Sequence, residues 1–193
     1  MQIKNAEFIK SVGVIKNYFN HDLTEIAIVG KSNVGKSSLI NMLTNNSKLA
    51  KVSKQPGKTK LLNYFLINKE FYLVDLPGYG FARVSKSEKT DWDDLMGHYF
   101  SSSEQLKAVI ILMDIRHDPS NDDKAMVQLC EYYSIPYIIV ATKADKIAKS
   151  KRKNECMRLK RLIPSSFDYT VLAVSNDGYG KDDLLMAIER KLS

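Results

Sequence analysis

The segment Gly30-Lys31-Ser32-Asn33-Val34-Gly35-Lys36-Ser37-Ser38 has the residue types and spacing of a phosphate-binding loop. An apolar run at 26–29 precedes it and a helical pattern follows, so a glycine-rich turn joins a buried strand to a helix. There, backbone N–H groups and the helix dipole attract an anion, Lys36 reaches the β- and γ-phosphates as a catalytic cation, and the Ser37 hydroxyl ligates Mg²⁺. A chance Gly-Lys loop would not come with this context. The sequence therefore predicts a nucleoside triphosphate site.

Two further segments suit the γ-phosphate and its metal ion. Asp75-Leu76-Pro77-Gly78 ends a predicted strand, where α/β folds bind ligands. We expect Asp75 to hold Mg²⁺ through a water and the catalytic Gly78 N–H to reach the γ-phosphate. The loop Gly57-Lys58-Thr59-Lys60-Leu61 is expected to contact the nucleotide, with Thr59 as catalytic residue and second Mg²⁺ ligand. Thr59 as an ordinary exposed loop threonine stays open as an alternative.

Two segments near the carboxyl end of the chain suit the base. In Thr142-Lys143-Ala144-Asp145, the Asp145 carboxylate can accept both N1–H and N2–H₂ of guanine, a donor pair that adenine lacks. The Lys143 stem can cover the base. A backbone N–H of Val174-Ser175-Asn176 can bond guanine O6. Together these segments favour GTP over ATP.

The elements needed to position these segments can be read from the hydrophobic pattern. Apolar, β-branched runs alternate with helical stretches, which predicts a three-layer α/β domain spanning 1–193, with 1–21 as an N-terminal extension packed on it. The short link at 68–70 requires an antiparallel hairpin. We expect six strands, five parallel and one antiparallel at the edge, with helices on both faces. Expected strands are 25–30, 61–68, 71–76, 109–113, 138–141 and 171–174; expected helices are 35–43, 87–101, 120–133, 149–162 and 181–192.

Composition limits the class of protein. The 193 residues are 44% hydrophobic, enough for one core, and no apolar stretch has the length of a membrane span. Residues 1–19 contain four charged side chains, which argues against a signal peptide. Cys130 and Cys156 lack metal-site spacing and are expected to be reduced thiols. We therefore expect a cytoplasmic monomer that does not bind membranes.

Positive charge is concentrated in two regions. The net charge is +7, and residues 26–69 contain eight lysines and no acidic residue. A second basic block covers 146–161, where Glu155 is the one acidic residue. Such blocks can be solvated surfaces or lysines that serve the phosphates, but two in one small domain favour a polyanionic partner such as RNA. The surfaces around 48–60 and 146–161 are the candidates, and reversing Lys151, Arg152 and Lys153 would test the second.

These segments together resemble the EngB (YihA/YsxC) family of bacterial ribosome-assembly GTPases, among the TrmE-Era-EngA-YihA-septin-like GTPases. The resemblance rests on residues 30–38, 56–59, 75–82, 114–117 and 141–146. It implies a P-loop NTPase fold of the Ras-like G-domain type that binds GTP, GDP and Mg²⁺. It also implies a nucleotide-dependent switch in assembly of the large ribosomal subunit, with an associated requirement in cell division and septation. A signalling GTPase with protein partners, or a septum-binding structural protein, would be the alternatives.

The sequence departs from the Ras-like pattern after the D-x-x-G segment. Ras-like enzymes orient the attacking water with a glutamine there, whereas this chain has Tyr79. We therefore expect slow intrinsic hydrolysis and completion of the site by another element. Arg83 is one candidate, although it could equally contact a partner. Asn33 resembles the asparagine that holds K⁺ in the TrmE group, or it simply shapes the loop. Arg116 and His117 have no obvious nucleotide role.

Overall fold

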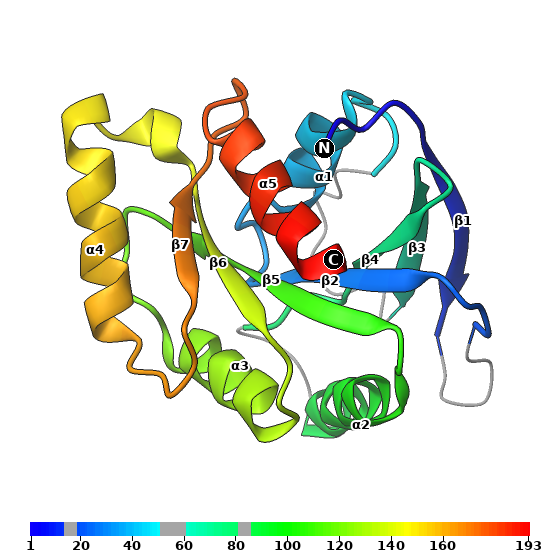
Figure 1. Cartoon of the computed structure of the whole chain (residues 1–193). Helices are drawn as coiled ribbons and strands as arrows, with labels where there is room; N and C mark the ends of the chain where they lie inside the picture. The colour runs from blue at the N-terminus through cyan, green and yellow to red at the C-terminus, as the bar shows by residue number, and fades with distance from the viewer. Residues whose placement is uncertain (14–18, 51–60, 81–85) are drawn as a thin grey trace.

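One seven-stranded sheet forms the centre of the molecule in the computed structural model, which describes residues 1–13, 19–50, 61–80 and 86–193 (Figure 1). The strand order is β1-β3-β4-β2-β5-β6-β7. The strands are β1 (Ala6–Val12), β2 (Thr24–Gly30), β3 (Leu62–Ile67), β4 (Phe71–Asp75), β5 (Leu106–Asp114), β6 (Tyr137–Thr142) and β7 (Thr170–Ala173).

Strand directions agree with the sequence prediction except at one edge. β2, β4, β5, β6 and β7 are parallel, and β3 pairs with β4 in the predicted antiparallel hairpin. The sheet has a seventh strand, however, because β1 pairs antiparallel with β3. The antiparallel strand is therefore second from the edge and not at it. Five consecutive residues of β1 are exposed, and its register shifts between Phe8 and Lys10, so it lacks the apolar run that marks a buried strand.

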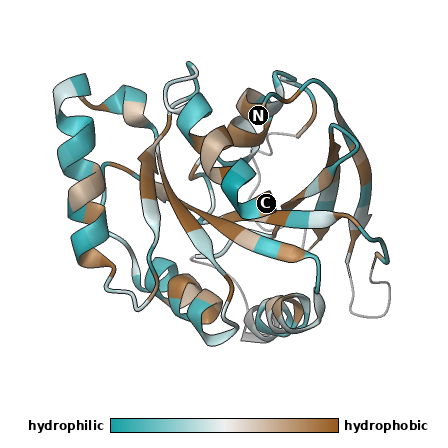
Figure 2. Ribbon diagram, in the orientation of Figure 1, coloured by the Kyte–Doolittle hydropathy of each residue, from teal (hydrophilic) through white to brown (hydrophobic). Residues whose placement is uncertain are grey.

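Helices cover both faces of the sheet, as predicted (Figure 1). Side chains of β2 alternate between two cores: Ile26 and Ile28 pack with α1 and α5, whereas Ala27 and Val29 pack with α2 and α3. In Figure 2 the hydrophobic colour accordingly predominates along β5, β6 and β7. The helices are α1 (Lys36–Thr44), α2 (Lys86–Ser102), α3 (Asn121–Tyr132), α4 (Arg152–Leu162) and α5 (Lys181–Leu192), with short 3-10 turns η2 (Ala144–Lys146) and η3 (Lys149–Lys151).

A buried carboxylate ties the start of β2 to α2. Glu25 is fully buried and accepts hydrogen bonds from the hydroxyls of Tyr99 and Ser103, and it pairs with His21 at 2.9 Å. Burial raises the pKa of this carboxyl, while those hydrogen bonds and the His21 ring counteract the rise. This cluster lies at the amino end of β2, whereas the candidate site lies at the carboxyl ends of the parallel strands.

Within the described parts of the chain, no helix combines the length and the apolar character needed to cross a membrane.

Candidate nucleotide-binding site

The predicted phosphate loop connects β2, which ends at Gly30, to α1, which begins at Lys36. Gly35 caps the helix with φ of 107°, a conformation that side-chain-bearing residues rarely adopt. No side chain caps α1, and its first turn contains no acidic residue. The amino end of the helix therefore keeps the N–H groups and partial positive charge that favour an anion.

Ser32 supplies a second indication that the loop suits a polar ligand. Its hydroxyl oxygen is buried and has no hydrogen-bond partner among the residues that the structure describes. A buried hydroxyl without a partner is costly, so such atoms are uncommon unless a ligand or water satisfies them. The loop residues therefore fit a phosphate group.

The cation of the phosphate loop lies against the carboxylate that ends β4. Lys36 Nζ donates to Asp75 Oδ1, and Asn63 Nδ2 lies 3.4 Å from Asp75 Oδ2. Parallel pairing of β2 with β4 brings Asp75 opposite Ile28, two residues before the loop. Sequence reasoning missed Asn63. The hairpin register would have found it, because a turn at 68–70 puts Asn63 directly opposite Asp75.

Gly78 passes directly against the phosphate loop. The Tyr79 N–H donates to Gly30 O at 3.4 Å, and the Ser32 N–H donates to Tyr79 O at 3.2 Å. A Cβ at position 78 would lie 3.0 Å from Gly30 O and 3.7 Å from Ser32 N. Only glycine fits this approach without displacing the loop backbone.

The Tyr79 side chain is buried between helices. Its hydroxyl donates to Asp123 Oδ1 of α3 at 2.8 Å, and its ring packs edge-on to Trp92 of α2. Trp92 Nε1 in turn donates to Pro77 O at 3.1 Å. Burial, with Asp123 adding to it, raises the pKa of Tyr79 well above its ordinary value. The phenol is thus a neutral donor committed to α3.

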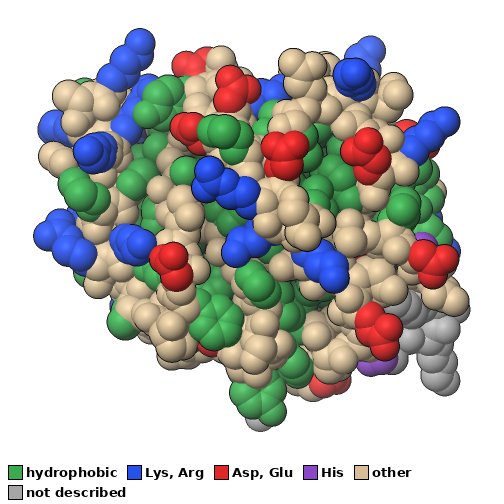
Figure 3. All heavy atoms as spheres, viewed as in Figure 1, with side chains coloured by type: hydrophobic (Ala, Val, Ile, Leu, Met, Phe, Trp, Pro, Cys, Tyr) green, Lys and Arg blue, Asp and Glu red, His purple; other side chains and the backbone are tan. Residues whose placement is uncertain are grey.

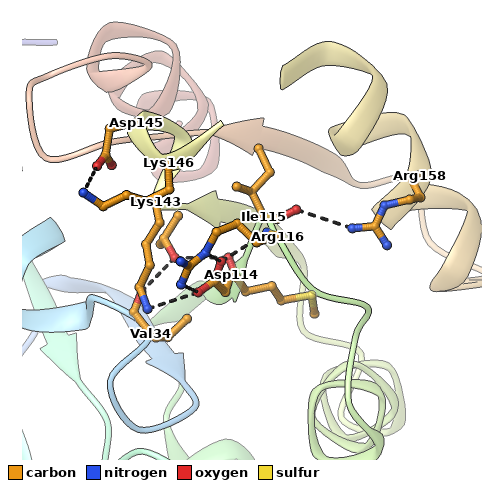
Figure 4. Close-up of polar contacts among 10 residues, drawn as sticks. Val34, Asp114, Ile115, Arg116, Lys143, Asp145, Lys146 and Arg158 are labelled. Carbon is orange, nitrogen blue, oxygen red and sulfur yellow. Dashed lines mark hydrogen bonds and ion pairs between the residues drawn. The ribbon is translucent and has the colours of Figure 1, made fainter. Parts of the chain in front are cut away.

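The segment predicted to bind guanine follows β6 and touches the phosphate loop (Figure 4). The buried Thr142 hydroxyl lies 2.7 Å from Val34 O and 3.1 Å from Met113 O. Lys143 has the left-handed φ of 60°, and Ala144 N–H donates to Val174 O at 3.2 Å. The contacts of Thr142 and Ala144 link the segment to both the phosphate loop and the end of β7.

Asp145 presents an exposed carboxylate at the start of η2. The Lys146 ammonium lies 2.9 Å from it and is the main cause of its lowered pKa. The group is ionised at neutral pH, as an aspartate is without any shift. An ionised carboxylate is acceptor-only, as recognition of the two guanine donors requires.

The loop after β7 completes this edge of the sheet. Ser175 is buried; its N–H donates to Tyr179 O at 3.1 Å and its hydroxyl to Asp177. Asn176 is exposed. The Val174 N–H donates to Ala141 O at 2.9 Å. Of the three residues predicted to contribute a backbone donor, Val174 and Ser175 therefore already use their amides within the protein.

Arg152 corrects one expectation from the sequence, because it is not a surface charge. The side chain is only 5% exposed, Nε donates to Ala144 O at 2.9 Å, and the guanidinium carbon lies 4.1 Å from the Tyr179 ring centroid. Arg152 therefore joins the two loops that carry Asp145 and Ser175. A basic run on a helix gives no signal that one member faces inward.

Several predicted site residues lie outside the described part of the chain. These are Gly57, Lys58, Thr59 and Lys60, together with Arg83. Leu61 is described and lies half-buried immediately before β3. All the other predicted site segments follow the carboxyl ends of β2, β4, β6 and β7. These strands are parallel, so their carboxyl ends lie on the same side of the sheet.

Comparisons with known proteins agree with this geometry. The model of the 50S ribosome-binding GTPase family matches residues 25–143. The probable GTP-binding protein EngB of Clostridium kluyveri is 50% identical over 190 residues, covering 98% of this chain and 96% of its own. The EngB of Oceanobacillus iheyensis is 44% identical over 193 residues, covering 98% of both chains.

Solved structures share the fold. The crystal structure of a probable GTP-binding protein EngB has a TM-score of 0.67 at 23% identity, covering 88% of this chain and 98% of its own. Era in complex with MgGDPNP and a 16S ribosomal RNA segment has a TM-score of 0.68 at 24% identity, covering 89% of this chain and 57% of its own. The chain therefore belongs to the EngB family of GTP-binding proteins, among the 50S ribosome-binding GTPases, and is a GTPase.

Proposed function

We propose that this GTPase is a nucleotide-dependent switch in assembly of the large ribosomal subunit. Nucleotide binding is supported by one observation: Lys36, Asp75 and Gly78 converge at the carboxyl ends of the parallel strands, next to the segment that ends in Asp145. The ribosomal half is supported by the family description and by the exposed basic face of η3 and α4. A requirement in cell division and septation would follow indirectly from defective ribosomes.

The residues at the phosphate end divide the work of binding. Lys36 is proposed to bind the β- and γ-phosphates. Because its ammonium donates to Asp75 in this structure, a bound triphosphate would compete with Asp75 for it. Gly78 would direct its N–H to the γ-phosphate. Ser37, Thr59 and, through a water, Asp75 would hold Mg²⁺. The ion supplies charge neutralisation at the phosphates when bound.

The residues at the base end set specificity. Asp145 would accept the two guanine donors, and the Lys143 stem would cover the base. Since the Val174 and Ser175 amides already donate to Ala141 O and Tyr179 O, Asn176 is the candidate donor to guanine O6. Hydrolysis is proposed to be slow because the Tyr79 hydroxyl is committed to Asp123 and cannot orient the water.

The partner surface is proposed to include the exposed lysines of η3 and α4. Lys149, Lys151 and Lys153 are exposed, and Lys and Arg side chains gather over α4 at the left of Figure 3. Exposed lysines that neutralise RNA phosphates release counterions, so binding should weaken steeply as salt rises. The residues 51–60 of the other basic surface lie outside the described part of the chain.

Co-sedimentation with large ribosomal subunits tests this proposal. The purified protein should pellet with subunits in a non-hydrolysable GTP analogue and much less in GDP. Reversing Lys149, Lys151 and Lys153 to Glu should abolish pelleting while GTP affinity is kept. The matched control reverses the exposed Lys4, Lys107 and Lys124, which lie off α4. No pelleting in either nucleotide would refute the ribosomal role and favour a signalling GTPase with protein partners.

A further inference from the structure

The segment Asp114-Ile115-Arg116-His117 has no part in the site as proposed so far, yet it contacts that site. Asp114 ends β5, and its Oδ2 lies 3.1 Å from Lys143 Nζ (Figure 4). Arg116 binds the same carboxylate with both ends of its guanidinium, Nε at 2.9 Å from Oδ1 and Nη2 at 2.7 Å from Oδ2. One carboxylate thus holds two cations, one of them the lysine proposed to cover the base.

The backbone holds both partners in place. β5 and β6 pair in parallel with Asp114 opposite Thr142, the residue before Lys143. Ile115 N–H donates to Thr142 O at 3.1 Å, and Arg116 N–H donates to Asp114 Oδ1 at 3.1 Å. Because the ends of the two strands are hydrogen-bonded to each other, the carboxylate has a fixed position from which to hold the lysine.

The ion pairs of Asp114 order the Lys143 side chain but contribute little to the stability of the fold. Burial raises the pKa of Asp114, but hydrogen bonds from Arg116 and Lys143 outweigh it and hold that pKa below its usual range. The Arg116 side chain is 39% exposed and that of Lys143 31%, so their ion pairs are screened by water and add little to stability. A lysine stem is flexible, however, and restricting it before binding removes an entropic cost of binding.

We propose that Asp114, clamped by Arg116, is a positioning residue for guanine-nucleotide binding, which holds the Lys143 ammonium so that the stem is placed to cover the base. This inference rests on the proposed base-binding role of Lys143 and Asp145. Since the base is common to GTP and GDP, the contribution is equal for both. It is absent for a ligand that has phosphates but no base.

A double-mutant cycle measured by calorimetry tests the inference. Dissociation constants are measured for GDP, a non-hydrolysable GTP analogue and tripolyphosphate, with Mg²⁺ throughout. Asp114→Asn keeps a side-chain oxygen for the Arg116 amide but removes the charge. It should weaken both nucleotides about three- to tenfold, the scale of ordering one long side chain. Lys143→Ala should weaken them at least as much, and the double variant should be no weaker than Lys143→Ala.

Asp118→Asn is the matched control, because it removes the same charge four residues along the same loop from a carboxylate that pairs with Arg158. It should leave all dissociation constants unchanged. The inference is overturned if the losses from Asp114→Asn and Lys143→Ala add, if Asp114→Asn has no effect, or if tripolyphosphate binding falls equally. The matching non-hydrolysable ATP analogue is measured alongside: if the unmodified protein binds it as tightly as the GTP analogue, the proposed base site itself fails, and this outcome is distinct from a failure of the Asp114 inference.

Discussion

Replacing Arg152 with alanine should destabilise the protein and weaken nucleotide binding, although the residue lies in a run of surface lysines. Its Nε donates to Ala144 O at 2.9 Å, and its guanidinium stacks on Tyr179 at 4.1 Å. The hydrogen bond is buried, since Arg152 is 5% exposed, whereas Tyr179 is 45% exposed. Alanine would remove the donor and the stacking partner together and leave the Ala144 carbonyl without its hydrogen bond.

The expected loss can be estimated from these two contacts. A hydrogen bond from a charged group contributes about 1.5–3 kcal/mol. A cation–π contact on a partly exposed ring contributes about 0.5–1 kcal/mol. Contacts that share one side chain are not additive, so we expect a loss of about 2.5 kcal/mol in the free energy of unfolding. For a chain of this size that corresponds to a fall in Tm of about 5–10 °C.

Thermal unfolding by circular dichroism measures the stability effect, and calorimetry with GDP measures the binding effect. Lys153→Ala is the matched control, because it makes the same substitution on the exposed side of the same helix. Its Tm should stay within about 2 °C of the unmodified protein, as for most surface substitutions. Equal Tm values for the Arg152→Ala and Lys153→Ala variants would refute the structural role of Arg152. An unchanged GDP affinity in Arg152→Ala would show that the loops carrying Asp145 and Ser175 do not need Arg152 in order to bind the nucleotide.

Four further outcomes follow from the site and the core. Lys36→Ala should abolish triphosphate binding with an unchanged circular dichroism spectrum, and normal GTP affinity would contradict the phosphate-loop role. Asp145→Asn should shift preference toward xanthosine triphosphate, and retained guanine selectivity would contradict base recognition. K⁺ should accelerate hydrolysis more than Na⁺ if Asn33 helps to hold it; equal rates would count against that. Because the pKa of Glu25 is raised in the folded protein, its protonated carboxyl favours the fold below pH 4.5, and this contribution is lost as pH rises through the raised pKa. The urea midpoint of Glu25→Gln, relative to that of the unmodified protein, should therefore increase between pH 4.5 and about 7; a constant difference would refute this.

The parallel sheet could be predicted from the sequence because each buried strand is a continuous apolar run bounded by a turn or a helix. β1 could not, because a strand that is exposed along most of its length needs no such run. Its place depends on the hydrogen-bonding edge that β3 leaves open, which is a property of the folded sheet. The predicted N-terminal extension thus contributes the seventh strand.

Site residues with fixed spacing could likewise be predicted, whereas those that support them could not. Lys36, Asp75 and Asp145 each belong to a short segment whose residue types and spacing indicate its role from the sequence. Arg152 and Asp114 act through residues distant in sequence, and nothing in a basic helix or a strand end tells which side chain turns inward. Tertiary packing decides that direction.

The two halves of the site are joined by protein contacts as well as by any ligand that spans them. The Thr142 hydroxyl reaches Val34 O in the phosphate loop, and the next residue is the lysine that Asp114 holds. A hydroxyl has one proton, so it bonds Val34 O at 2.7 Å in preference to Met113 O at 3.1 Å. A hydrogen bond of this kind is worth about 0.5–1.5 kcal/mol. A shift of the phosphate loop would therefore displace Thr142 and, with it, the adjacent Lys143. Through Thr142, the free energy of coupling between phosphate binding and base binding should not exceed the free energy of this hydrogen bond.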